Sequence, residues 1–198
     1  MKKILVVLLA AIVGISAVNA QPTKKQLKAV KSEVAAWTAE GWKVAPGNST
    51  MAEQIIMQKE YAKKVNNEGE PLYVFGESTA VGQTFKAAQL SVMRGVKMNA
   101  LEQLDTEITA IIQNDLANKQ QSLDKAVSVD KVLNRTKEVI SNRLPRGIKV
   151  VTVYRELKTK NVEVRAMYAY NYDKVHDMIA AAASEALEKE IDEMVKGN

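Results

Sequence analysis

Apolar residues recur along this chain with two periods, one typical of helices and one typical of strands. Over residues 24–40 the apolar positions fall every three or four residues, at Leu27, Val30, Val34 and Trp37. This spacing predicts an amphipathic helix that stops at Gly41. Thr50 and Glu53 then form a capping box, which predicts a second helix from Met51 to about Val65.

The period changes to that of a strand after residues 66–69. Residues 71–75 are rich in aromatic and branched side chains and short enough for a strand, and residues 76–78 are typical of a turn. From Thr84 the helical period returns and extends toward Leu116, which predicts one long helix with Gly95 as a weak point, because glycine is a poor helix former.

A further helix is expected from Ser122 to Arg143, ended by Pro145 and Gly147. Residues 148–157 and 162–172 then form two strand-like runs whose four-residue connection suits a hairpin. The second run has one core face and one wet face. Asp173 is the expected N-cap of the last helix, which continues to Lys196.

This order of elements predicts an α+β fold. We expect a small, mostly antiparallel sheet of about three strands, with long helices packed on one face. The domain organisation would comprise residues 1–20 as a signal peptide, residues 21–68 as an N-terminal helical extension and residues 69–198 as the α+β domain. The pattern leaves open whether the N-terminal helical pair packs onto the sheet or extends away from it.

The first twenty residues have the three regions of a cleavable secretory signal peptide. Lys2 and Lys3 precede an apolar run over residues 4–13, and small residues lead to an expected cleavage between Ala20 and Gln21. The apolar run is too short to span a bilayer, and no later stretch approaches that length. We therefore expect a periplasmic or secreted protein without a transmembrane segment in its mature chain.

Composition narrows the possible functions. Removal of residues 1–20 removes two lysines and no acidic residue, so the net charge falls from +5 to +3, which does not favour nucleic-acid binding. The sequence has no cysteine, so disulfides, thiolate chemistry and lipid attachment through a cysteine are excluded.

Few residues suggest catalysis. Residues 76–80 partly match the G-x-S-x-G motif of a serine hydrolase, with Ser78 as nucleophile, but the fifth position is Ala80, and His176 is the only histidine. His176 and its neighbouring aspartates supply too few ligands for a metal site, and the simpler interpretation is a solvated or capping side chain. The carboxylate pairs Glu102/Asp105 and Glu188/Asp192 lie at helical spacing, as on an exposed helix face. No cofactor, metal or catalytic residue is predicted.

The sequence favours a binding surface over a catalytic site. A basic cluster surrounds the predicted hairpin and forms a possible surface for an envelope protein or a glycan, through Arg143, Arg146, Lys149, Arg155, Lys158, Lys160 and Arg165. The last helix carries the opposite charge, at Glu185, Glu188, Glu190, Asp192 and Glu193. Self-association through these opposite charges is a second possibility. Three tyrosines on one strand face, Tyr168, Tyr170 and Tyr172, suit either a core face or a sugar-stacking platform.

Part of the chain resembles a known family. The segments 73–78, 87–88 and 91–94, followed by a long helix and a return through residues 168–170, are similar to the LPP-twenty family of small bacterial envelope lipoproteins. The similarity covers about residues 70–180 and implies an envelope location and a binding or structural role without catalysis. This chain lacks the cysteine that carries the lipid in that family, so the resemblance does not imply anchoring.

The sequence thus predicts an exported, non-enzymatic envelope protein with a structural or binding role. One alternative is a hydrolase or glycan-active enzyme that uses Ser78 or a carboxylate pair. Another is a carrier of an apolar ligand, which requires a cavity of several hundred Å³, lined by Val, Ile and Met, between the long helix and the sheet.

Overall fold

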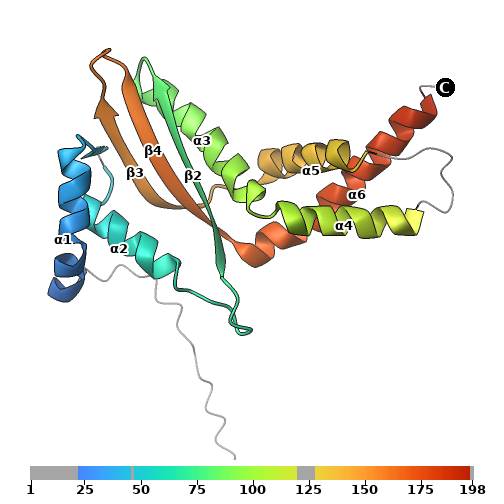
Figure 1. Ribbon diagram of the computed structural model, residues 1–198, viewed down its shortest axis with the longest axis horizontal. Coiled ribbons are helices and arrows are strands. Elements are labelled where there is room, and N and C mark those ends of the chain that lie inside the picture. The colour runs from blue at the N-terminus through green and yellow to red at the C-terminus, as the bar shows by residue number, and fades with distance from the viewer. Residues whose placement is uncertain (1–21, 46, 120–127, 197–198) are drawn as a thin grey trace, which may run out of the picture.

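The computed structural model describes residues 22–45, 47–119 and 128–196 (Figure 1). The predicted signal peptide with Ala20 and Gln21 lies outside these residues, as does the predicted helix start at Ser122. The helices are α1 (Lys24–Ala39), α2 (Met51–Tyr61), α3 (Phe85–Glu102), α4 (Asp105–Lys119), α5 (Val129–Arg143) and α6 (Tyr172–Lys196). The strands are β1 (Lys43–Val44), β2 (Tyr73–Gly82), β3 (Ile148–Glu156) and β4 (Val162–Asn171).

The four strands form one antiparallel sheet in the order β1-β3-β4-β2, which confirms the predicted α+β fold. The sheet has one strand more than the expected three, because the two residues of β1 pair with Val153 and Tyr154 at the edge of β3. Two residues are too few to produce a recognisable strand pattern in the sequence.

Helices cover both faces of the sheet, which corrects the expectation of one covered and one wet face. On β4, Val164, Ala166, Tyr168 and Tyr170 face the core under α3. The intervening Met167 and Ala169 are buried with residues of α1 and α2. The N-terminal helical pair therefore packs onto the sheet instead of extending away from it (Figure 1).

Strand β2 continues through the segment that was predicted to be a turn. Residues 76–80 lie in the middle of β2 and pair with β4 throughout. Glycine is needed here for close packing and not for a turn, because a Cβ on Gly76 would lie 1.9 Å from the carbonyl oxygen of Val96 in α3. The prediction of a turn at residues 76–78 was wrong for this reason.

The predicted long helix is two helices, α3 and α4, and the break lies at Gln103 and Leu104, not at Gly95. Helix α3 packs against β2 and β4, whereas α4 packs against α5 and α6. Both Leu104 and Ile108 are buried, so the apolar spacing continues across the break and hides it in the sequence. The break lies where the apolar helix face stops contacting β2 and β4 and begins to contact α5 and α6.

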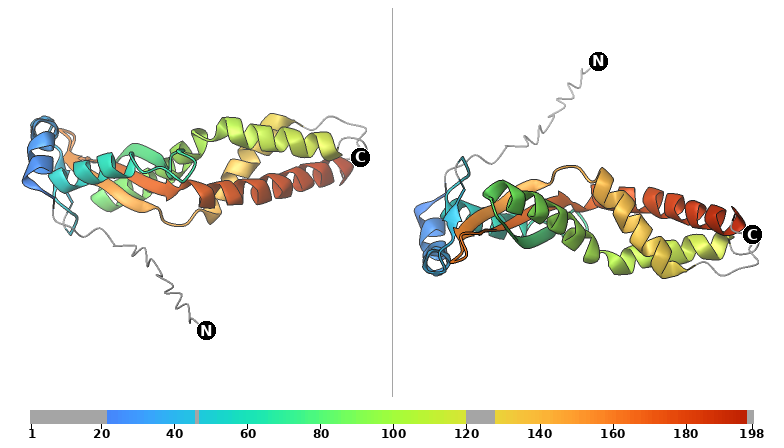
Figure 2. Two further views of the ribbon diagram at one scale, coloured as in Figure 1. Left: turned by 90° about the horizontal axis from the view of Figure 1, so that it is seen from below. Right: turned by 90° about the horizontal axis from the view of Figure 1, so that it is seen from above.

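Helices α4, α5 and α6 form an arm that projects from one end of the sheet, so the molecule is elongated (Figure 2). Its interior contains fully buried side chains from all three helices, including Ile108, Ile112, Val132, Ile140, Ile179 and Leu187.

Helix α6 follows β4 directly, with no residue between them. Asn171 Oδ1 accepts a hydrogen bond from the backbone N–H of Lys174 at 3.0 Å. Asn171 is therefore the cap, in place of the predicted Asp173. No helix in the described part of the chain combines the length and apolarity needed to cross a membrane.

Candidate binding groove between two helices

The residues of the predicted basic surface do not form one patch. Arg155 and Arg165 lie on the sheet face covered by α1, where Arg155 bonds to Glu163 and Arg165 bonds to Glu77. Each guanidinium also lies over a tryptophan ring, Arg155 at 4.4 Å from Trp42 and Arg165 at 5.1 Å from Trp37. These two arginines are held within the fold by carboxylates and aromatic rings.

The other members of that predicted surface are divided between the two ends of the β3–β4 hairpin. Lys158 and Lys160 are exposed in its turn, whereas Arg143, Arg146 and Lys149 lie at the opposite end. At about 3.3 Å per strand residue, β3 separates these groups by about 25 Å. A single anionic ligand of ordinary size therefore does not reach both groups.

Charges proposed for self-association instead pair within the molecule. Arg143 Nη1 of α5 lies 2.6 Å from Glu185 of α6, and Arg135 bonds to both Glu190 and Glu193. The hydrogen bond from Arg135 is the main cause that lowers the pKa of Glu193. These pairs hold α5 against α6, so they are less available for contacts between molecules.

Ser78 lies in an environment that does not suit a nucleophile. Its Oγ faces α3 and lies 2.2 Å from the position that a Cβ on Gly95 would take, so the helix occupies the space above it. His176 is exposed on α6, where its ring stacks on Tyr172 at a centroid distance of 6.1 Å. This placement agrees with a solvated histidine near a helix start.

Of the candidate carboxylates, Glu102, Glu188 and Asp192 are exposed, whereas Asp105 forms an ion pair. Asp105 pairs with Lys137 at 2.6 Å, and within the described residues no three His, Asp or Glu side chains gather as a metal site. Tyr168 and Tyr170 are buried, and burial raises the pKa of both, that of Tyr170 to about 12. They are core residues, which removes the sugar-stacking platform.

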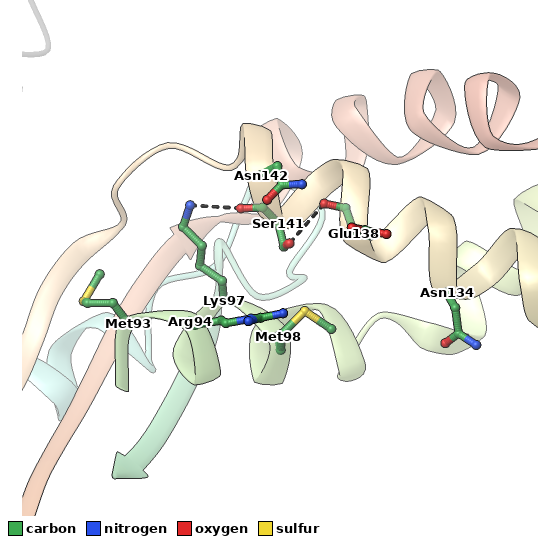
Figure 3. Close-up of a pocket in the computed structure, with 8 residues that line it drawn as sticks. All are labelled: Met93, Arg94, Lys97, Met98, Asn134, Glu138, Ser141 and Asn142. Atoms are coloured by element: carbon green, nitrogen blue, oxygen red, sulfur yellow. Dashed lines mark hydrogen bonds between the residues drawn. The ribbon is translucent and has the colours of Figure 1, made fainter. Parts of the chain in front are cut away.

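A groove with a volume of about 870 Å³ lies between α3 and α5 (Figure 3). Helix α3 contributes one wall and α5 the other, through Met93, Arg94, Lys97, Met98, Asn134, Glu138, Ser141 and Asn142. Sequence reasoning missed this groove. The available signal was a pair of methionines on α3, just outside its apolar stripe, with two cationic residues between them.

Lys97 connects the two helices at the end of the groove that is formed by the C-terminus of α5. Its Nζ donates to the carbonyl oxygens of Ser141 and Leu144, at 2.9 Å each, and so links α3 to the C-terminus of α5 (Figure 3). A cation is favourable there because the last carbonyls of a helix have no partners in the helix and carry partial negative charge. The two walls are therefore held at a defined separation.

The groove combines adaptable apolar side chains with polar groups at its rim. Met93 and Met98 are half-buried, whereas Arg94, Asn134, Glu138 and Asn142 are exposed. Methionine adapts its shape to different apolar partners, and the amides and charges can form hydrogen bonds with a polypeptide. The arrangement suits non-covalent binding of a protein segment.

In the comparisons with known proteins, no protein-family model, curated protein or solved structure matches this chain.

Proposed function

We propose that this protein is an exported, non-enzymatic component of the bacterial envelope that binds a partner protein in the groove between α3 and α5. The observation that carries the proposal is the groove itself, which is lined by two half-buried methionines of α3 and by exposed polar and charged side chains of both helices. Methionine and arginine, both present here, are enriched in surfaces that bind other proteins.

The envelope location rests on the sequence. It is supported by the predicted signal peptide with cleavage between Ala20 and Gln21, and by the resemblance of residues 70–180 to the LPP-twenty family. Without a cysteine, the mature protein has no site for the lipid of that family. We therefore propose a periplasmic or secreted protein that reaches the envelope by binding, and not by a lipid anchor.

A catalytic role has less support. Ser78 is covered by α3, and Asp105 is engaged by Lys137. The other paired carboxylates, Glu102, Glu188 and Asp192, lie exposed on helices. General acid and base catalysis requires carboxylates with different environments in one cleft. The described residues show no such pair in the groove, where Glu138 is the one carboxylate.

Site-specific photocrosslinking in intact cells tests the proposal. A photoreactive amino acid is placed at Met98 in the groove, and a matched control carries it at Thr159 in the exposed hairpin turn. We expect a defined crosslinked band from Met98 and none of that mass from Thr159, and Met93 should give the same band. Equal crosslinking from both surfaces, or none from the groove, would contradict the proposal.

Cell fractionation tests the location separately. The full-length chain should appear in the periplasm or medium, shortened by residues 1–20, and an Ala20→Arg variant should accumulate unprocessed. If the unmodified chain keeps its N-terminus and stays in the cytoplasm, the proposed location is wrong.

A further inference from the structure

A second cavity lies where the sheet meets the helical arm. Its volume is about 240 Å³, and it is bounded by the segment 144–148, the end of β4 and the first turns of α6. The carrier hypothesis placed a cavity between the long helix and the sheet, where the glycine contacts of β2 and α3 leave little space. The cavity of about 240 Å³ therefore lies at a different place from the one that this hypothesis predicted.

The wall of this cavity is mainly apolar. Leu144 and Val175 are buried, Met178 is half-buried, and Ile148 of the lining is one of the large apolar side chains that remain exposed, at 39%. An exposed isoleucine beside an apolar hollow gives up contact with water when a ligand covers it. The cavity therefore favours an apolar chain.

The position of the segment 144–148 is set by packing against β4. A Cβ on Gly147 would lie 2.9 Å from both the carbonyl oxygen of Ala169 and the ring of Tyr170. Glycine is what allows this close approach. Because Ala169 and Tyr170 belong to the buried sheet, the cavity wall is formed before any ligand arrives.

Two cations, Arg146 and Lys174, complete the lining. Both are exposed, and neither forms a salt bridge with a carboxylate among the residues that the structure describes. Lys174 also lies in the first turn of α6, where the helix N-terminus favours negative charge. The lining contains no acidic residue.

We propose that this cavity binds a medium-chain fatty acid, with its carboxylate at Arg146 and Lys174 and its chain against Leu144, Val175 and Met178. At about 30 Å³ for a group the size of a water molecule, the volume accommodates a chain of about eight carbons. This inference does not depend on the groove between α3 and α5, so either proposal can fail without the other.

Calorimetric titration of the mature chain with octanoate tests the site. Octanoate should bind, acetate should not because it lacks the chain, and octanol should bind more weakly because it lacks the charge. Absence of octanoate binding, or equal binding of octanol and octanoate, would overturn the proposal.

Matched charge variants locate the binding. The double variant Arg146→Gln, Lys174→Gln should weaken octanoate binding by about tenfold, because the charged partners of the carboxylate are lost. The control Lys158→Gln, Lys160→Gln removes the same charge from the hairpin turn and should leave the affinity unchanged. All four side chains are exposed, so folding is retained, as circular dichroism would verify. Equal loss of affinity in both double variants would show a nonspecific charge effect and reject the site.

Discussion

The side chain of Ser78 in β2 lies directly against the backbone of Gly95 in α3, with its Oγ 2.2 Å from where a glycine Cβ would be. Gly76 and Gly82 of the same strand also approach α3 closely, because a Cβ added to Gly76 would lie 1.9 Å from the carbonyl oxygen of Val96 and one added to Gly82 would lie 2.6 Å from the nitrogen of Ala88. The strand and the helix are thus in contact along most of their length. This contact holds the helix that forms one wall of the groove.

Replacing Gly95 with alanine should destabilise the protein. In an exposed helix this change stabilises by about 1 kcal/mol, but here the added Cβ meets Ser78, and overpacking of this kind costs about 1–3 kcal/mol. Urea unfolding should show the loss, and Ser78→Gly added to Gly95→Ala should recover part of it. The exposed Ser91→Ala serves as control, with a change within about 0.5 kcal/mol. A Gly95→Ala variant that is more stable than the original chain would contradict the observed packing.

Loss of Arg135 should weaken the helical arm. Glu190 has a side chain only 8% exposed, and Arg135 Nη1 contacts it at 3.0 Å. Arg135→Gln leaves this carboxylate with Lys131 alone, at 3.3 Å, so we expect a loss of about 1–3 kcal/mol of unfolding free energy. The double variant Arg135→Gln, Glu190→Gln should recover most of this loss. If the double variant is no more stable than the single one, the unpaired charge is not the cause.

The Tyr172–Glu107 hydrogen bond predicts a pH dependence. Tyr172 donates to Glu107 at 2.8 Å, and this bond is the main cause that raises the pKa of Tyr172 to about 12. Because the folded pKa lies above the unfolded value of about 10, the stabilisation is complete below pH 10. It decreases as the pH rises from about 10 to about 12, where the unfolded chain loses its proton first.

Two variants test this dependence. Tyr172→Phe should show a smaller loss of stability over that alkaline range, and Glu107→Gln should lower the pKa of Tyr172 toward its ordinary value. Phenolate absorbance measures the titration, and urea unfolding at several pH values measures the stability. An unchanged titration curve in Glu107→Gln would mean that Glu107 does not set this pKa.

Side chains of the helices occupy backbone groups of β2, at one edge of the sheet, and of β3, where β1 does not cover it. At the β2 edge, Asn99 accepts from the backbone N–H of Glu77 at 3.0 Å, and Gln103 donates to the carbonyl oxygen of Phe75. On the opposite side of the sheet β1 pairs with only two residues of β3, and next to them Gln54 accepts from the N–H of Thr152 at 2.7 Å. These contacts occupy backbone groups that another strand would otherwise pair with.

Removal of the block at β2 should promote association. The variant Asn99→Ala, Gln103→Ala should self-associate with increasing concentration in sedimentation experiments, because an open edge pairs with a second chain. Adding Val81→Lys on the same strand should suppress this association, since an edge lysine opposes strand pairing. A double variant that remains at the mass of the original chain would contradict this role of Asn99 and Gln103.

The sequence alone determined the features that depend on neighbouring residues. The capping box of Thr50 and Glu53 is present, with Thr50 N–H donating to Glu53 at 2.7 Å, and α1 ends where Gly41 was expected to stop it. The hairpin of β3 and β4 also lies where its pattern placed it. Caps, turns and periodicity are set by residues within a few positions of one another, so the α+β class was readable from them.

Only the tertiary structure decided the features that join distant segments. In the sequence, Gly76 indicated a turn and Gly95 indicated a weak point of a helix. In the structure both glycines allow close packing, because β2 and α3 meet there. Arg165 was read as a free surface cation, yet it pairs with Glu77, 88 positions earlier in the chain. The groove and the smaller cavity likewise need α3, α5, α6 and the sheet together. The residues next to a position in the sequence do not indicate which distant segment packs against it.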